Sequence, residues 1–251
     1  MMKKTIILLG LCLSTLLVQA QISLGVVAGV NMCNEVTSFN TDWSNSKANE
    51  MPSLKGVVVG PTIELMVPKY DIGMELGTFY SRKGSNFSYE LYKGSYAFQL
   101  DGYKEFDYLE MPLTLKWKFG PKDFKIFVSG GYYWGYAFGG TVGVEKAIDL
   151  ITGNQQNDLV KTTKMQFGDD ESNKYNLIDR GYTCGLGVQI VRTIQLSVNY
   201  SYATKSHVNE KSIKDLLPEE TYGYSETDFG ISSKHSSFSV RLTYLFNSGG
   251  R

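Results

Sequence analysis

The sequence predicts an all-β protein: an eight-stranded antiparallel up-and-down transmembrane β-barrel with short periplasmic turns and four long extracellular loops. Three observations support this fold class. Eight segments alternate apolar residues with polar or small ones, the connections between them alternate between short and long, and aromatic residues gather near both ends of the segments. Side chains of a strand point to opposite faces in turn, so each segment presents one apolar face and one polar face.

The segment Asp107–Phe119 shows this alternation most clearly. From Leu109 onward every second residue is apolar, and the residues between them include Glu110 and Lys116. Each of the eight segments has about 9–15 residues, which is enough for a tilted strand to cross a bilayer. The other seven are Ile22–Met32, Val57–Val67, Tyr70–Ser81, Phe124–Phe138, Arg180–Ile190, Ile194–Tyr202 and Ser237–Phe246.

Short and long connections alternate along the whole chain. The short ones are "PKY", "GPKD" and "VRT", and the long ones are Cys33–Gly56, Arg82–Asp107, Gly139–Asp179 and Ala203–Ser236. All short turns therefore fall at one end and all long loops at the other, as in transmembrane β-barrels. A soluble sandwich or lipocalin-like barrel is the alternative, but neither architecture requires this regularity.

The apolar faces are expected to meet lipid, because only a closed barrel satisfies every strand N–H and C=O group within a bilayer. Aromatic residues such as Trp117 near the short turns and Trp134 toward the long loops would mark the two membrane interfaces. Pro61 and Pro112 each remove one hydrogen-bond donor, so we expect a local bulge at both.

The first 20 residues are predicted to be a secretory signal peptide, removed before Gln21. Two lysines precede an apolar run from Thr5 to Val18, and Val18-Gln19-Ala20 resembles a cleavage site. The run is too short for a membrane helix. The domain prediction is therefore a signal peptide over 1–20 and an outer-membrane barrel domain over 21–251.

Composition excludes some classes of function. Lys plus Arg and Asp plus Glu both number 25, so the charge balance gives no reason to expect nucleic-acid binding. The mature chain would hold two cysteines, Cys33 and Cys184. They could pair, but Cys184 falls on an apolar strand face and reads more readily as a small apolar filler.

Several segments resemble one known family. "DYLEMPLTLKWKF" resembles the "YLEIPLLLK" signature of the Bacteroidetes outer-membrane barrel family that includes PorT. "FVSGGYYWGYAFGG", "DRGYTCGLGVQI" and "SFSVRLTYLF" resemble later strands of that family. The resemblance implies an integral β-barrel in the outer membrane of a Gram-negative bacterium. It also implies an accessory part in type IX secretion as one candidate role.

The inward faces carry the candidate site residues. An eight-stranded barrel is narrow enough to be filled by side chains, and charges there must pair to offset their desolvation. We expect Glu64, Glu75 or Glu110 to pair with Arg241 or Lys116. The result would be a polar plug, with a small porin-like channel as the alternative.

The sequence offers no catalytic, cofactor-binding or metal site that we would assign, and we expect the protein not to be an enzyme. The two histidines, His207 and His235, lie in the last long loop or its rim. "GDDESN" (168–173) could bind calcium through its carboxylates, but it lacks the EF-hand spacing, so a solvated loop is the favoured interpretation.

We therefore expect a structural or interaction role through the surface loops. The segments 86–106 and 219–230 are rich in Tyr, a composition suited to recognition of proteins or glycans. The first of them could instead extend two strands as a hairpin with its turn near Lys93-Gly94-Ser95. The expected partners are outer-membrane lipid and envelope or secretion proteins, and the barrel is expected to be a monomer without cofactors.

Overall fold

The computed structural model describes residues 21–38, 47–51, 55–93, 96–155, 157, 160–168, 175–208 and 232–246. The predicted signal peptide, residues 1–20, lies outside this part. No helix of the described chain is long and apolar enough to cross a membrane. The strands in the described ranges are β1 (Gln21–Ser38), β2 (Lys47–Met51), β3 (Lys55–Val67), β4 (Ile72–Gly77), β5 (Phe79–Lys93), β6 (Tyr96–Phe119), β7 (Phe124–Asp149), β8 (Thr162–Lys164), β9 (Ile178–Ile190), β10 (Ile194–Ala203) and β11 (Ser232–Phe246).

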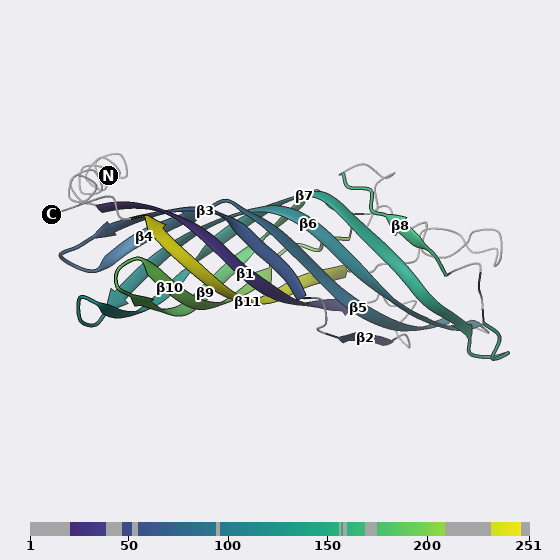
Figure 1. Cartoon of the computed structure of the whole chain (residues 1–251). Helices are drawn as coiled ribbons and strands as arrows, with labels where there is room; N and C mark the ends of the chain where they lie inside the picture. Colours follow the sequence, from purple (N-terminus) through teal and green to yellow (C-terminus); the bar gives the residue numbers. More distant parts are fainter. Residues whose placement is uncertain are drawn as a thin grey trace, which may run out of the picture.

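Eight strand positions form a closed antiparallel ring (Figure 1). Only Thr78 separates β4 from β5, and the two share one register against β3, so together they fill one position. Pairing of β1 with β11 joins the first and last strands, and pairing of β6 with β7 completes the ring. The short strands β2 and β8 pair with β5 and β7 outside it. The predicted eight-stranded antiparallel barrel is confirmed.

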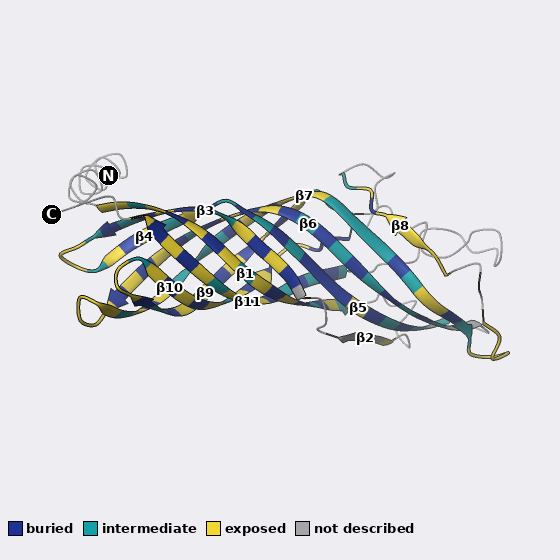
Figure 2. Cartoon of the chain, in the orientation of Figure 1, coloured by how far each residue is buried: buried dark blue, intermediate teal, exposed yellow. Residues whose placement is uncertain are grey.

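The ring is apolar outside and polar inside, the inverse of a soluble barrel. Along β6, Leu115 is 62% exposed, Lys116 3% and Trp117 55%. Figure 2 shows the same alternation as exposed and buried bands on neighbouring strands. Because lipid is an apolar solvent and the interior is a closed space, this is the pattern of a transmembrane β-barrel.

Left-handed backbone helps to close the three short turns. Asp71 has φ 53°, Gly120 φ 126°, Val191 φ 51° and Arg192 φ 61°. Two consecutive positive φ values suit the right-handed twist of the hairpin that joins β9 and β10. Val191 is β-branched and adopts this conformation at a cost in strain.

Two of the four predicted long loops are in large part strands. Residues 82–107 form a hairpin in which β5 and β6 pair from Arg82–Asp107 to Lys93–Tyr96, the alternative that the sequence also allowed. β7 likewise continues past Phe138 to Asp149 and pairs with β6 up to Phe98. Beyond the membrane both faces of a sheet can meet water, so the apolar period of two fades although the strands go on.

The predicted bulges at Pro61 and Pro112 are wrong. Both residues sit in unbroken register, and the register shifts between β6 and β7 fall at Asp101/Gly102 and Asp107/Tyr108 instead. The two prolines, which have no backbone N–H to donate, lie opposite the break between β4 and β5. The register places Pro61 opposite Thr78 and Pro112 opposite Gly77, and the Thr78 amide still donates to the Pro61 carbonyl oxygen at 3.0 Å.

Candidate functional site

The barrel interior is filled by three groups of polar side chains. The lower network lies toward the short turns and comprises Glu64, Glu75, Lys116, Lys118 and Gln195. Lys116 Nζ lies 3.0 Å from Glu64 Oε2 and donates to Gln195 Oε1 at 3.0 Å. Lys116 also pairs with Glu75, and Lys118 pairs with Glu64. The strands β3, β4, β6 and β10 supply these side chains, since each residue points inward by the strand period.

The middle network lies further along the barrel and comprises Lys83, Glu110, Tyr133 and Asp179. Lys83 Nζ lies 3.1 Å from Asp179 Oδ2 and 3.4 Å from Glu110 Oε2. The ammonium group also stands 4.6 Å from the centre of the Tyr133 ring. All four side chains are buried, so the charges are compensated inside the barrel rather than by water.

The structure thus distributes the five residues predicted for the interior network over different partners. Glu64, Glu75 and Lys116 come together, whereas Glu110 lies beside Lys83. Arg241 has no carboxylate partner within the described ranges: its Nε donates to Ser239 Oγ at 3.0 Å, and its guanidinium lies 5.3 Å from the centre of the Phe79 ring. Beside it is a polar cavity of about 10 Å³, roughly the room for one water molecule.

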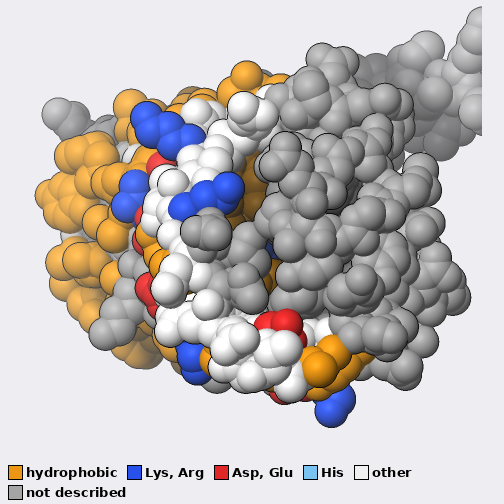
Figure 3. Space-filling model, turned by 90° about the vertical axis from the view of Figure 1, so that its right-hand side faces the viewer, with side chains coloured by type: hydrophobic (Ala, Val, Ile, Leu, Met, Phe, Trp, Pro, Cys, Tyr) orange, Lys and Arg blue, Asp and Glu red, His pale blue; other side chains and the backbone are white. Residues whose placement is uncertain are grey.

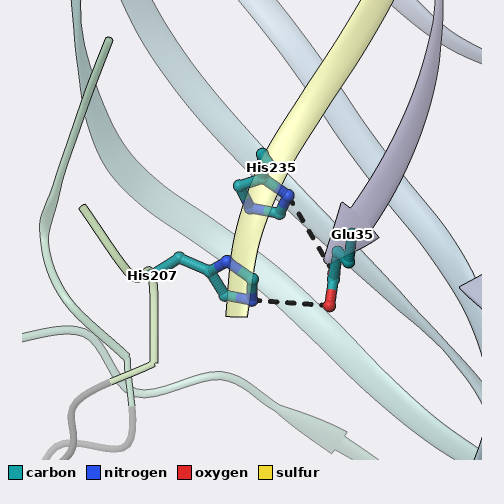
Figure 4. A group of neighbouring side chains, drawn as sticks. All are labelled: Glu35, His207 and His235. Carbon is teal, nitrogen blue, oxygen red and sulfur yellow. Dashed lines mark ion pairs between the residues drawn. The ribbon is translucent and has the colours of Figure 1, made fainter. Parts of the chain in front are cut away.

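The third group, the upper cluster, lies at the long-loop end and comprises Glu35, Lys104, His207 and His235. Figure 4 shows Glu35 and the two histidines. Glu35 on β1 and His235 on β11 are direct cross-strand neighbours. His207 reaches the cluster from the segment that follows β10. Its position is fixed because its backbone N–H donates to the Ser233 carbonyl at 2.9 Å and its own carbonyl accepts from the Asn176 amide at 2.8 Å.

The two imidazoles and the carboxylate of the upper cluster converge. His207 Nε2 lies 3.6 Å from Glu35 Oε2, and His235 Nδ1 lies 4.0 Å from Glu35 Oε1. The two imidazole rings stack with centroids 4.0 Å apart and 13° between their planes. Phe106 seals one side with its ring edge-on to both, at 4.9 and 4.8 Å. Glu35, His207 and His235 are each no more than 2% exposed.

The two carboxylate oxygens of Glu35 differ in their hydrogen bonding. Lys104 Nζ and Ser233 Oγ both donate to Oε2 at 3.0 Å, while Oε1 has no hydrogen-bond partner in the described structure. The same holds for both ring nitrogens of His207. By contrast, His235 Nε2 lies 3.3 Å from the Tyr108 hydroxyl, and His235 Nδ1 lies 3.6 Å from Cys33 Sγ. Buried polar atoms without a partner are rare in folded proteins.

His207 lies beyond the end of β10, outside the membrane-spanning strands. Burial and the neighbouring His235 hold the pKa of His207 well below its ordinary value, against the opposing effect of Glu35. The imidazole is therefore neutral at pH 7 and carries a free lone pair. Within the described ranges, Glu35, His207 and His235 are the one group of three His, Cys, Asp or Glu side chains arranged to hold a metal ion.

Apart from Glu110, the residues of the middle network and the upper cluster are not among those predicted from the sequence as site residues. Glu35 continues the inward alternation of Asn31 and Cys33, and Lys83 and Lys104 continue the alternation of the strands on either side of the hairpin. That signal could have found them, had the strands been extended. Nothing local in the sequence links His207 to His235. Pairing of β10 with β11 brings the segment after β10 beside β11, and the ring closure between β1 and β11 brings Glu35 to the same place.

The two cysteines of the barrel do not pair. Cys33 and Cys184 are both free: Cys33 is buried inside the barrel, and Cys184 is exposed on its outer face. The acidic segment "GDDESN" lies outside the described residues apart from Gly168, so the calcium interpretation stays a prediction.

The closed fold, the exposed apolar outer wall and the filled polar interior together define this protein as an integral outer-membrane β-barrel. The chain belongs to the family described as outer membrane protein beta-barrel domain, whose model matches residues 19–206. The protein is accordingly located in the outer membrane. A comparison with curated protein sequences found no match.

The chain is also similar to several solved outer-membrane structures. OprG from Pseudomonas aeruginosa is 12% identical, with 90% of this chain and 97% of that chain covered and a TM-score of 0.46. The outer membrane protease OmpT from Escherichia coli is 13% identical, with 90% and 96% covered and a TM-score of 0.40. The outer membrane enzyme PagL is 10% identical, with 86% and 98% covered and a TM-score of 0.28. These likenesses concern the fold alone.

The expectation that the protein is not an enzyme is overturned by these comparisons. Two of the matched barrels, OmpT and PagL, are enzymes by their descriptions. Activity resides in a site and not in the fold, so the barrel architecture by itself gives no argument against catalysis.

Proposed function

We propose that the protein is an interaction protein of the outer membrane and that its binding surface is the projecting sheet. This name denotes residues 82–93 of β5, 96–107 of β6 and 139–149 of β7. The observation that carries the proposal is the continuous pairing of these three strands beyond the barrel (Figure 1). Twelve paired residues extend about 40 Å along a strand.

A paired sheet is a better binding surface than a free loop, because its backbone is ordered before a partner arrives and less entropy is lost on binding. The lateral edges of the sheet are partly covered as well. β2 pairs with residues 86–90 of β5, and β8 pairs with residues 141–143 of β7. Edge-to-edge association is thereby hindered, so the face and tip of the projecting sheet are the parts open to a partner.

The surface chemistry fits a polar partner such as an envelope protein or a glycan. Asn86, Glu145 and Lys146 are exposed, and Ile151 at the tip is an apolar anchor with 63% exposure. Figure 3 views the molecule from this end: hydrophobic side chains cover the barrel wall, and Lys, Arg, Asp and Glu side chains lie among polar ones on the described rim. Non-obligate interfaces are only about as apolar as the rest of a protein surface, so a mainly polar face with an apolar residue at its tip is compatible with this role.

Site-specific photo-crosslinking in intact cells tests the proposal. A photoreactive residue is placed at Lys146 in the projecting sheet, and a matched one at Lys122 in the short turn between β6 and β7. We expect reproducible crosslinks to one partner from position 146 and none to that partner from position 122. Crosslinks from position 122 alone would refute the projecting sheet as the binding surface and place the interaction on the periplasmic side.

The resemblance of β6 to the family that includes PorT supports a finer version of this role, an accessory part in type IX secretion. The supporting observation is the sequence of residues 107–119. Deletion of the gene should then reduce the amount of type IX cargo at the cell surface, and re-expression should restore it. Unchanged cargo would rule out this version and leave the interaction role to be judged by the crosslinks.

A further inference from the structure

We propose that Glu35, His207 and His235 bind one divalent transition-metal ion, with Zn²⁺ as the ion that best fits the donors. The proposal is independent of the interaction role, because its three ligands lie on β1, on β11 and in the segment after β10, and none of them belongs to the projecting sheet. Two imidazoles and one carboxylate suit zinc and its neighbours in the first transition row, whereas Mg²⁺ and Ca²⁺ prefer oxygen donors alone.

The three donors are already close to ligand spacing. Zinc binds imidazole nitrogen and carboxylate oxygen at roughly 2.0–2.2 Å, so tetrahedral ligands lie about 3.4 Å apart. His235 Nδ1 lies 4.0 Å from Glu35 Oε1, the proposed ligand atom, and His207 Nε2 lies 3.6 Å from the other carboxylate oxygen, Oε2. All three ligand atoms lie within 4.8 Å of one another. Small side-chain movements therefore suffice to bring them around one ion.

The unpartnered atoms point to the same conclusion. Glu35 Oε1 and both nitrogens of His207 are buried and lack hydrogen-bond partners in the described structure. Such atoms are unfavourable unless something satisfies them. A bound cation would satisfy Oε1 and one imidazole nitrogen together, while Oε2 keeps the hydrogen bonds from Lys104 and Ser233.

One ring must turn for the ion to bind. An imidazole binds metal through a lone pair in the plane of its ring, and the two rings are nearly parallel at 13°, so both cannot aim at one point as they stand. His207 is the ring free to rotate about its Cβ–Cγ bond, because no hydrogen bond holds its nitrogens. Tyr108 would keep His235 in place by accepting from Nε2, as partners of metal-bound histidines commonly do.

Lys104 would act as a positioning residue that weakens the site. Its ammonium group lies 3.0 Å from Glu35 Oε2 and so brings a positive charge beside the expected ion. Like charges repel strongly where water is excluded. Replacing Lys104 by Gln keeps a hydrogen-bond donor and removes the charge, so metal affinity should rise.

The experiment is a metal titration of the full chain purified in detergent without a histidine tag. The chain has two histidines, both in this cluster, so no other imidazole contributes. After treatment with EDTA, Zn²⁺ binding is measured by calorimetry and Co²⁺ binding by its visible absorption. The variants are Glu35→Gln, His207→Gln and Lys104→Gln, with Glu145→Gln on the exposed part of β7 as the matched control.

We expect one Zn²⁺ per chain, binding at least about tenfold weaker in Glu35→Gln and His207→Gln, tighter in Lys104→Gln, and unchanged in the control. Circular dichroism checks that each variant keeps its strands. If a variant fails to fold, X-ray absorption of the Zn²⁺-bound wild type decides by showing imidazole ligands or none. Absence of stoichiometric binding, or binding that both ligand variants retain in full, would overturn the proposal.

Discussion

At the scale of single residues, the contribution of a buried charge to stability depends on the number of partners that contact it. Glu64 contacts Lys116, Lys118 and Gln195, which come from two different strands of the ring. Arg241 is also inward-facing, yet it rests on the Phe79 ring and bonds to Ser239. The two residues looked equivalent in the sequence, and their different surroundings give them different weights in stability.

Replacing Glu64 by Gln should lower the free energy of unfolding by about 3–5 kcal/mol, because two buried ammonium groups lose their shared carboxylate. Urea-induced unfolding in lipid vesicles, followed by tryptophan fluorescence, measures the change. Arg241→Gln is the control and should cost no more than about 1 kcal/mol, since it removes a cation–π contact and leaves no carboxylate unpaired. Equal losses in the two variants would show that the lower network does not depend on Glu64.

At the scale of elements, β6 passes through two solvents. Its residues from Tyr108 to Phe119 alternate sharply between lipid and interior, while those from Tyr96 to Asp107 lie in the projecting sheet beyond the membrane. The same backbone pairing therefore continues under two different rules for side chains. In lipid every outward position must be apolar, and in water it can be polar.

A charge on the outer face of a strand should consequently destabilise the barrel within the bilayer and have little effect beyond the membrane. Leu115→Arg, at a position 62% exposed on the lipid-facing wall, should destabilise the barrel by about 2–4 kcal/mol if it lies near the bilayer midplane. The matched change Asn86→Arg, exposed on β5 in the projecting sheet, should have little effect. Folding yield and urea stability in vesicles report both. An unaffected Leu115→Arg protein would contradict the placement of this strand in lipid.

At the scale of the whole molecule, the lower network, the middle network and the upper cluster follow one another through the interior. Tyr108 links the upper two, since its hydroxyl lies 3.3 Å from His235 Nε2 and its ring lies 5.2 Å from Lys83 Nζ. An eight-stranded barrel is narrow enough for side chains to fill it. The three groups therefore act as a polar plug that holds the ring together from within.

The protein should accordingly give no stable unit conductance in a planar bilayer. The channel alternative requires a continuous water path, and the polar cavity of about 10 Å³ beside Arg241 has room for roughly one water molecule. A larger open porin in the same bilayer serves as the positive control. Reproducible current steps from the wild-type barrel would revive the channel function and argue that the plug rearranges.

The sequence by itself determined the barrel, because lipid imposes a strict period of two on each membrane-spanning strand. Asp107–Phe119 and its seven companions were each located to within about two residues at the short-turn end. Beyond the membrane the outward positions need not be apolar, so the apolar period is weaker there and the hairpin of β5 and β6 could be given only as an alternative to a loop. Its strands are held by pairing between neighbours, which a single strand's sequence does not reveal.

The inward position of Glu64, Glu75, Glu110, Lys116 and Arg241 also followed from the sequence, since inward and outward residues alternate. Which charge meets which was decided by the tertiary structure alone. Register and ring closure set Lys83 beside Glu110 and bring His207 onto His235 and Glu35. These contacts join residues far apart in the chain, and their geometry depends on how eight strands are staggered around one axis.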